Sequence, residues 1–214
     1  MNLYMRKKPV SVMTEKNDVK TNLINKPISI ADPAPLGLIG LAVAALVLAS
    51  SDLGLVSSAA KSLMIPWVLF FGATVQLIAG NVEFKRNNIF GATVFTTYSM
   101  TMYAIALTLF ITIFTDVQFS IAHYGFGLVA ILVFSLIATI ASLMTNKMLF
   151  IILIFVDLAV LALIPHYFFG VSAVPAGVFL ACTSVTSFYT AFAIFLNNMA
   201  QKSILPLGKA IWNP

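Results

Sequence analysis

Six long apolar stretches, separated by short polar segments, make up most of this chain of 214 residues. They cover residues 36–51, 65–81, 89–114, 121–144, 148–169 and 173–198. A bilayer core about 30 Å thick takes about 20 apolar residues per helical crossing, so this pattern predicts six transmembrane helices. The first stretch is short, and we extend its helix past Asp52 as far as Val56. The fourth and fifth stretches are separated only by residues 145–147, and the predicted break rests on Asn146 and Lys147.

The composition favours the same class of protein. Hydrophobic residues make up 60% of the chain and charged residues only 9%. A soluble domain carries about 25% charged residues, so this chain has too few charges to cover a globular surface. We therefore expect an all-α integral membrane protein.

The basic residues predict the orientation of these helices. With six crossings, eleven of the twelve Lys and Arg residues fall on one side of the membrane and only Lys61 falls on the other. Cytoplasmic segments are enriched in Lys and Arg, so we expect cytoplasmic N- and C-termini and multi-pass insertion in the plasma membrane. The basic residues behind the net charge of +5 then set the topology and attract anionic lipid head groups. This charge therefore predicts no nucleic-acid partner.

The helices define the predicted domain organisation. Residues 31–208 form the transmembrane domain. Residues 1–30 are polar and contain no apolar run, which predicts a disordered cytoplasmic tail, and residues 209–214 form a short C-terminal tail.

No enzyme motif is present in the sequence. It contains no HExxH, phosphate-binding glycine loop, CxxC pair or serine-nucleophile elbow. His123 and His166 are placed near helix ends without a third ligand type, which is typical of interfacial side chains. We therefore predict no enzymatic activity, no catalytic residues, no metal site and no cofactor.

Hydroxyl side chains form stripes on two of the predicted helices. Such stripes either line a pore, where hydroxyls replace the hydration shell of a solute, or pack between helices and bond to their own backbone. A tyrosine lies beside each stripe. The candidate pathway hydroxyls are Thr97, Ser187 and Tyr189.

Asp157 lies near the middle of the fifth predicted helix. An Asp at the bilayer centre costs about 2.5–3.5 kcal/mol on insertion scales, so it is expected to face the bundle interior or water. No Lys or Arg has a comparable depth in the sequence. Asp157 is therefore a candidate proton site, and the alternative is a neutral carboxyl hydrogen-bonded to a hydroxyl of a neighbouring helix.

Three motifs in this order resemble those of the acetate uptake transporters, the acetate/succinate permease family of bacteria, archaea and fungi. Residues 31–38 read ADPAPLGL, which is similar to the NPAPLGL signature of that family. Residues 80–98, GNVEFKRNNIFGATVFTTY, and residues 204–208, ILPLG, resemble two further family patterns.

This resemblance implies a function and a site. Members of the family are expected to form homohexamers in the bilayer, with a central pore in each protomer for acetate and other short monocarboxylates, and for succinate in some cases. The resemblance places the narrowest point of the pore at Leu41, Tyr98 and Val156. It also implies an entrance motif that consists of Asp32, Pro33, Pro35, Gly37 and Glu83.

The sequence departs from the family pattern at three positions. Asp32 replaces the signature Asn, and Lys26, Lys85 or Arg86 is the expected partner of its charge. Asp157 replaces a small polar residue beside the predicted constriction, and Ile194 stands where some relatives carry Glu.

These departures leave the mode of transport open between an anion channel and a proton symporter. Two alternatives to a carboxylate pathway also stay open. One is a pore for small neutral solutes such as urea, amides or ammonia, and the other is a non-transporting membrane sensor of the same fold.

Overall fold

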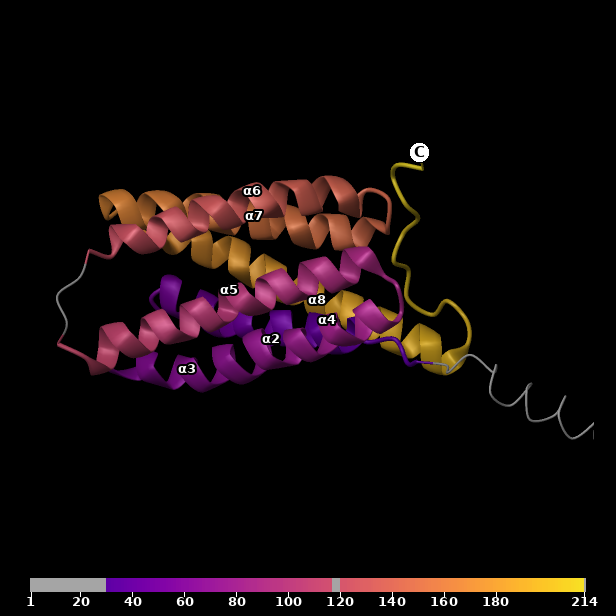
Figure 1. Cartoon of the computed structure of the whole chain (residues 1–214), viewed down its shortest axis with the longest axis horizontal. Coiled ribbons are helices and arrows are strands. Elements are labelled where there is room, and N and C mark those ends of the chain that lie inside the picture. The colour runs from indigo at the N-terminus through magenta and orange to yellow at the C-terminus, as the bar shows by residue number, and fades with distance from the viewer. Residues whose placement is uncertain (1–29, 117–119, 214) are drawn as a thin grey trace, which may run out of the picture. The chain divides into compact units, whose positions relative to one another are not determined.

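The computed structural model describes residues 30–116 and 120–213, so the expected N-terminal tail lies outside the described residues apart from Ile30. From Asp32 onward the chain forms one compact unit (Figure 1). Within the described residues, six helices are long and apolar enough to cross a membrane, and none of these residues is in a β-strand. The predicted all-α architecture with six transmembrane helices is thereby confirmed. The spans are Ala34–Asp52, Ala60–Lys85, Ile89–Phe114, Ala122–Ser142, Lys147–Phe169 and Val174–Ala200.

The second span is composite, whereas the other five are single helices. The single helices are α2 (Ala34–Asp52), α5 (Ile89–Phe114), α6 (Ala122–Ser142), α7 (Lys147–Phe169) and α8 (Val174–Ala200). The second span begins within η1 (Ser58–Leu63), a 3₁₀ helix, and continues through α3 (Met64–Trp67), the π-helical η2 (Val68–Val75) and α4 (Gln76–Lys85). A π-helical segment widens the helix and is frequent at functional sites.

Capping residues explain where these helices begin and end. Asn146 accepts a hydrogen bond from the Leu149 backbone N–H at 3.0 Å, so the predicted break before α7 is an N-cap. The predicted extension of the first helix to Val56 is wrong. α2 ends at Asp52, because Gly54 adopts a left-handed backbone conformation with φ of 71°.

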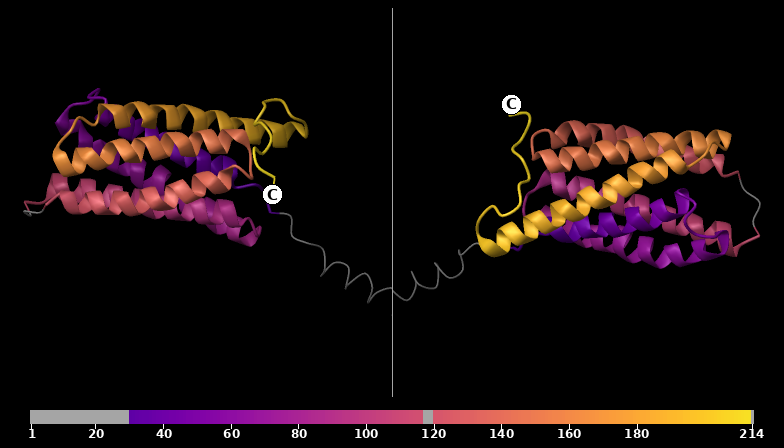
Figure 2. Two further views of the ribbon diagram at one scale, coloured as in Figure 1. Left: turned by 90° about the horizontal axis from the view of Figure 1, so that it is seen from above. Right: turned by 180° about the vertical axis from the view of Figure 1, so that it is seen from behind.

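The spans form a closed ring. α6 packs on α7, α7 on α8, α8 on α2, α2 on the second span, and the second span on α5, which returns to α6 (Figure 2). Small residues allow the close packing of α2 on α8, where Ala42, Ala45, Ala191 and Ala193 are all buried. The ring leaves space along its axis, and this space contains the site.

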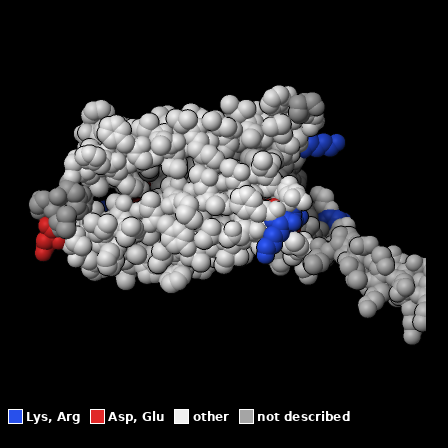
Figure 3. Space-filling view, in the orientation of Figure 1, with Lys and Arg blue, Asp and Glu red and all other residues white. Residues whose placement is uncertain are grey.

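The exterior of the ring is apolar. Large hydrophobic side chains such as Phe126, Ile137 and Ile140 of α6 are exposed. In Figure 3 the visible Lys and Arg side chains gather at one end of the bundle, and acidic residues appear at the other. A long uncharged exterior between charged ends is typical of a protein that crosses the bilayer, and this chain is a multi-pass membrane protein.

The segment after α8 folds back on the bundle. The Leu207 carbonyl accepts a hydrogen bond from the Met148 N–H at 3.2 Å, and the Leu143 carbonyl accepts from the N–H groups of Ile211 and Trp212. Gly208 adopts a φ of 73° and approaches Lys147 so closely that a Cβ atom would collide with its side chain. The predicted C-terminal tail is thus paired with the turn between α6 and α7.

Candidate functional site in the helix ring

Two cavities lie along the inside of the ring and share part of their walls. The large cavity has a volume of about 180 Å³ and extends to Asp52 and Lys61 at one end of the bundle. The small cavity has a volume of about 60 Å³ and extends to Glu83 and Asn88 toward the other end. A water molecule occupies roughly 10–15 Å³ on such a measure, so both cavities can hold small solutes.

Leu41 of α2 and Tyr98 of α5 separate the two cavities. Both side chains line the large cavity and the small cavity, and both are almost fully buried, with exposed fractions of 6% and 3%. Val156 of α7, with an exposed fraction of 8%, lines the large cavity beside them. The structure therefore brings together the three residues of the predicted constriction from three different spans.

A chain of hydroxyl groups connects Tyr98 to Asp157. The Tyr98 hydroxyl lies 2.6 Å from the Ser135 hydroxyl of α6, and Ser135 donates to Oδ1 of Asp157. The other carboxylate oxygen, Oδ2, accepts from the Thr139 hydroxyl at 2.7 Å. All four side chains are buried.

The direction of this chain follows from the number of protons. A serine hydroxyl has a single proton, and Ser135 gives that proton to the Asp157 carboxylate. Tyr98 must then be the donor toward Ser135. If Asp157 is protonated, the direction of these hydrogen bonds can reverse, so that Asp157 donates to Ser135 and Ser135 donates to Tyr98. The hydroxyl proton of Tyr98 is then free to point into the cavities. The hydrogen bonds thus connect the Asp157 carboxylate to a side chain that lines both cavities.

The large cavity ends in a polar group of side chains. Asp52, Lys61 and His166 line this end together with Tyr124 and Tyr167. The Nδ1–H of His166 donates to the Val171 carbonyl at 2.6 Å, which leaves its Nε2 as the free ring nitrogen. A charged solute at this end meets groups of both signs.

The polar wall of the small cavity contains Gln76, Glu83 and Asn88, and its remaining lining is mostly apolar. Glu83 of the predicted entrance motif follows the second apolar stretch, which ends at residue 81. In the structure it lies within α4, which extends to Lys85, and its exposed fraction is only 1%. Gly91 makes room for it, since a Cβ there would lie 2.8 Å from Oε1 of Glu83.

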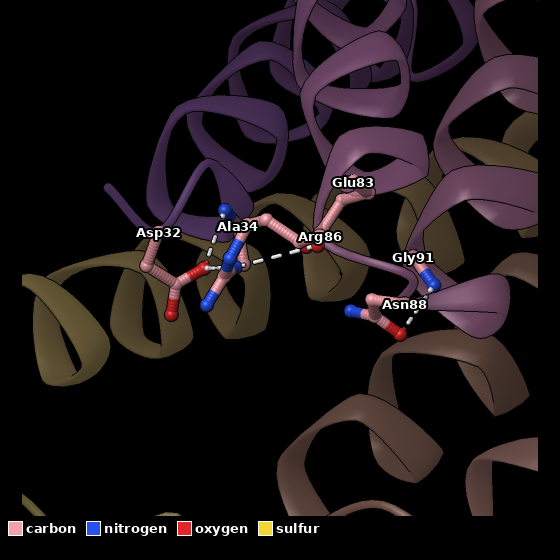
Figure 4. A network of polar contacts seen from close by, with 6 residues as sticks. All are labelled: Asp32, Ala34, Glu83, Arg86, Asn88 and Gly91. Atoms are coloured by element: carbon pink, nitrogen blue, oxygen red, sulfur yellow. Dashed lines mark hydrogen bonds and ion pairs between the residues drawn. The ribbon is translucent and has the colours of Figure 1, made fainter. Parts of the chain in front are cut away.

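Arg86 pairs with two carboxylates, one of which, Glu83, lines the small cavity (Figure 4). Its Nη1 lies 2.8 Å from Oδ1 of Asp32 and 3.3 Å from Oε2 of Glu83. Of the expected partners of Asp32, Lys26 lies outside the described residues, and Arg86 rather than Lys85 forms the recorded ion pair. The three side chains together carry a formal charge of −1.

The entrance motif shapes the beginning of α2. Asp32 accepts a hydrogen bond from the Ala34 N–H at 3.1 Å, and proline in the first turn has no N–H to leave unpaired. Gly37 packs against Phe95, whose ring would lie 2.5 Å from an added Cβ. These residues set the position of α2 and hence of Leu41.

The structure does not bring the three candidate pathway hydroxyls to the shared wall. Thr97 lines a separate hollow between α5 and α6, and Tyr189 donates to the Pro206 carbonyl at 2.8 Å. Ser187 is buried, and neither Ser187 nor Tyr189 lines the cavities described here. The hydroxyl groups beside the constriction are those of Ser135 and Thr139 instead.

Sequence reasoning missed Ser135, Thr139 and Gln76. The signal for the first two was their spacing of four residues on the helix before Asp157, which places both hydroxyls on one helix face. The signal for Gln76 was an amide within an otherwise apolar stretch. Among the described residues, no group of three or more His, Cys, Asp or Glu side chains could hold a metal ion.

A ring of membrane-spanning helices with two internal cavities that share a wall is an arrangement found in membrane transport proteins. Residues 18–208 match the GPR1/FUN34/yaaH family, and the chain belongs to that family.

Curated relatives and a solved structure agree with this membership. The chain is 36% identical over 81 residues to the succinate-acetate/proton symporter SatP of Escherichia coli strain K12, an alignment of 36% of this chain and 42% of the relative. It is 27% identical over 207 residues to acetate permease A of Emericella nidulans, covering 86% of this chain and 68% of the relative. The solved bacterial acetate channel SatP superposes with a TM-score of 0.77 at 25% identity and covers 84% of this chain and all of that chain.

Proposed function

We propose that this protein conducts acetate and related short monocarboxylates, succinate among the candidates, across the plasma membrane. The observation that carries the proposal is the pair of cavities that meet at Leu41 and Tyr98. A solute that passes from one cavity to the other must pass these two side chains. Relatives named for acetate and succinate transport, and the fold shared with an acetate channel, support this substrate class.

The constriction suits a small acid with a methyl end. Leu41 and Val156 offer apolar surface, and Tyr98 adds one hydroxyl. Hydrophobic constrictions exclude hydrated ions by dewetting, whereas a small organic acid keeps favourable contacts with the wall. The cavity volumes are sufficient for a molecule of the size of acetic acid.

We infer that transport is coupled to protons through Asp157. Its carboxylate is buried beside the constriction and reaches Tyr98 through Ser135. A buried acid without a neighbouring cation is an expected proton carrier in a membrane transporter. The coupling distinguishes a symporter from a passive channel.

We also propose an orientation of the bundle in the membrane and a homohexameric assembly. The described basic residues Lys85, Arg86, Lys147, Lys202 and Lys209 share one end of the bundle, so that end is assigned to the cytoplasm. The exposed apolar faces of the ring leave room for neighbouring protomers as well as lipid, in agreement with a homohexamer.

Uptake of radiolabelled acetate into proteoliposomes tests the proposed function. Empty liposomes are the control, because neutral acetic acid crosses bilayers unaided. Uptake above that of empty liposomes, inhibited by excess unlabelled acetate, is the expected result. If uptake does not exceed the control, the substrate is not acetate, and flux of urea or amides then distinguishes a neutral-solute pore from a non-transporting protein.

A further inference from the structure

Gln76 presents an unpartnered acceptor in the wall of the small cavity. Its side chain is completely buried, and its Nε2 donates to the Gly72 carbonyl at 2.7 Å. A carbonyl can only accept, so this contact fixes which end of the amide is nitrogen and which is oxygen. The oxygen, Oε1, has no hydrogen-bond partner among the described residues.

A buried acceptor without a donor is costly. Leaving such a group unpaired costs about 1–3 kcal/mol, and this cost is removed when a ligand supplies the missing donor. Gly40 of α2 packs directly against the second span. Because Gly40 has no Cβ, α2 can approach the backbone of Phe71 and the Cγ of Gln76. Gln76 is thus held in place beside the cavity with an acceptor to satisfy.

The surrounding charges exclude an anion from the same cavity. Glu83 contributes a carboxylate to the wall, and the nearby Arg86 is already paired with Glu83 and Asp32. The three groups leave a formal charge of −1 near the cavity. A carboxylate placed here would face the Gln76 oxygen and the Glu83 carboxylate, both of which repel it.

We propose that the small cavity binds its solute in a neutral, hydrogen-bond-donating form, with Gln76 Oε1 accepting the donor. For the proposed acetate pathway, on which this inference rests, that form is acetic acid, whose O–H points to Gln76. A primary amide such as acetamide has the same shape and an N–H donor, so it occupies the same site. A carboxylate that stays ionised does not.

Competition on the wild-type protein tests this inference without a mutation. Acetamide and trifluoroacetate, which stays ionised, are each added to labelled acetate uptake in proteoliposomes. The expected result is inhibition by acetamide and much weaker inhibition by trifluoroacetate. Equal or stronger inhibition by trifluoroacetate would overturn the proposal while leaving acetate transport itself established.

A pair of variants tests the role of Gln76 directly. Gln76→Met keeps the length of the side chain and removes the acceptor, and it is expected to weaken inhibition by acetamide about two- to tenfold, the worth of one hydrogen bond. Thr96→Val is the matched control, because the Thr96 hydroxyl is also buried and unpartnered among the described residues but does not line the small cavity. Equal inhibition in Gln76→Met and wild type would overturn the assignment.

A binding measurement separates this inference from the proposed function. Acetamide is expected to raise the thermal unfolding temperature of the purified wild type and of Thr96→Val, and to raise that of Gln76→Met less at the same concentration, because a ligand stabilises the folded state that binds it. This result supports the site even if acetate flux is absent. The same shift in all three proteins, or in none, contradicts it.

Discussion

Asp157 and Asp32 carry the same carboxyl group in two different surroundings. Asp157 is buried among hydroxyls, and the only partners that the structure records for its carboxylate are Ser135 and Thr139. Asp32 is half-exposed and pairs with Arg86 at one end of the bundle. In the proposed mechanism Asp157 carries a proton, and Asp32 lowers the attraction of carboxylates to this end of the bundle. Each role predicts the effect of removing the charge.

Asp157→Asn is expected to weaken the coupling of transport to protons. The amide keeps the shape and the hydrogen-bonding capacity of the side chain but cannot take up a proton near neutral pH. Acetate uptake should therefore stay above that of empty liposomes while its response to an inward proton gradient decreases, and the response that remains is that of acetic acid carrying its own proton. Ser142→Ala is the control, because the Ser142 hydroxyl bonds only the Thr139 carbonyl. An undiminished response in Asp157→Asn would exclude this residue as the proton site.

Asp32→Asn is expected to make this end of the bundle more attractive to carboxylates. Asn retains an oxygen for the Ala34 N–H, so α2 keeps its beginning, while Arg86 loses a counter-ion at 2.8 Å. An exposed pair of charges is worth about 1 kcal/mol in water, so the acetate concentration for half-maximal uptake should fall about two- to fivefold at low salt.

The matched control for this change is Asp116→Asn, because Asp116 is exposed near the other end of α5. Initial uptake rates over a range of acetate concentrations provide the measurement. A higher half-maximal concentration in Asp32→Asn than in wild type would reverse the assigned role.

The elements are positioned by glycines more than by large side chains. α2 approaches η2 where Gly40 meets the Phe71 carbonyl, and an added Cβ would lie 2.5 Å from that oxygen. This contact keeps α2, and with it Leu41, close to the second span. At Gly127 of α6, by contrast, an added Cβ would have no atom within 4 Å and would face open space.

Gly40→Ala should therefore destabilise the protein, and Gly127→Ala should not. Forcing a methyl group against backbone costs about 1–3 kcal/mol, whereas Gly to Ala in an open helical position is neutral or stabilising by up to about 1 kcal/mol. Thermal unfolding in detergent measures both variants against wild type. An unfolding temperature of Gly40→Ala equal to that of Gly127→Ala would show that this contact does not position α2.

The sequence predicts these elements much better than the contacts between them. Hydropathy and the basic residues are local properties, and they were sufficient for the number of spans and for the break at Asn146. The partner of a polar side chain depends on the neighbouring helix instead. Tyr189 and Tyr98 look alike in their stripes, yet one bonds the C-terminal segment and the other borders both cavities.

On the scale of the whole molecule, the two ends of the ring differ in charge. Described basic residues such as Lys85, Arg86 and Lys147 lie at one end, and Lys61 lies at the other. This asymmetry supports the proposed orientation, in which the end with Arg86 faces the cytoplasm. In that orientation the small cavity lies toward the cell interior and the large cavity toward the exterior.

Cysteine labelling in intact cells tests this orientation. Leu55→Cys and Lys202→Cys place exposed thiols at opposite ends of the bundle, and Cys182→Ala removes the native thiol as a background. A membrane-impermeant maleimide should label Leu55→Cys in intact cells and Lys202→Cys only after permeabilisation. The reverse pattern would invert the orientation.

If acetate passes between the two cavities at Leu41 and Tyr98, as we propose, a bulky side chain at that point should block its flux. Leu41→Trp fills the shared wall, whereas Leu46→Trp adds the same ring to the exposed face of α2. Acetate flux into proteoliposomes is compared at equal amounts of assembled protein. The account predicts flux near that of empty liposomes for Leu41→Trp and wild-type flux for Leu46→Trp. Wild-type flux in Leu41→Trp would contradict it, because the solute would then cross by a route that avoids the constriction.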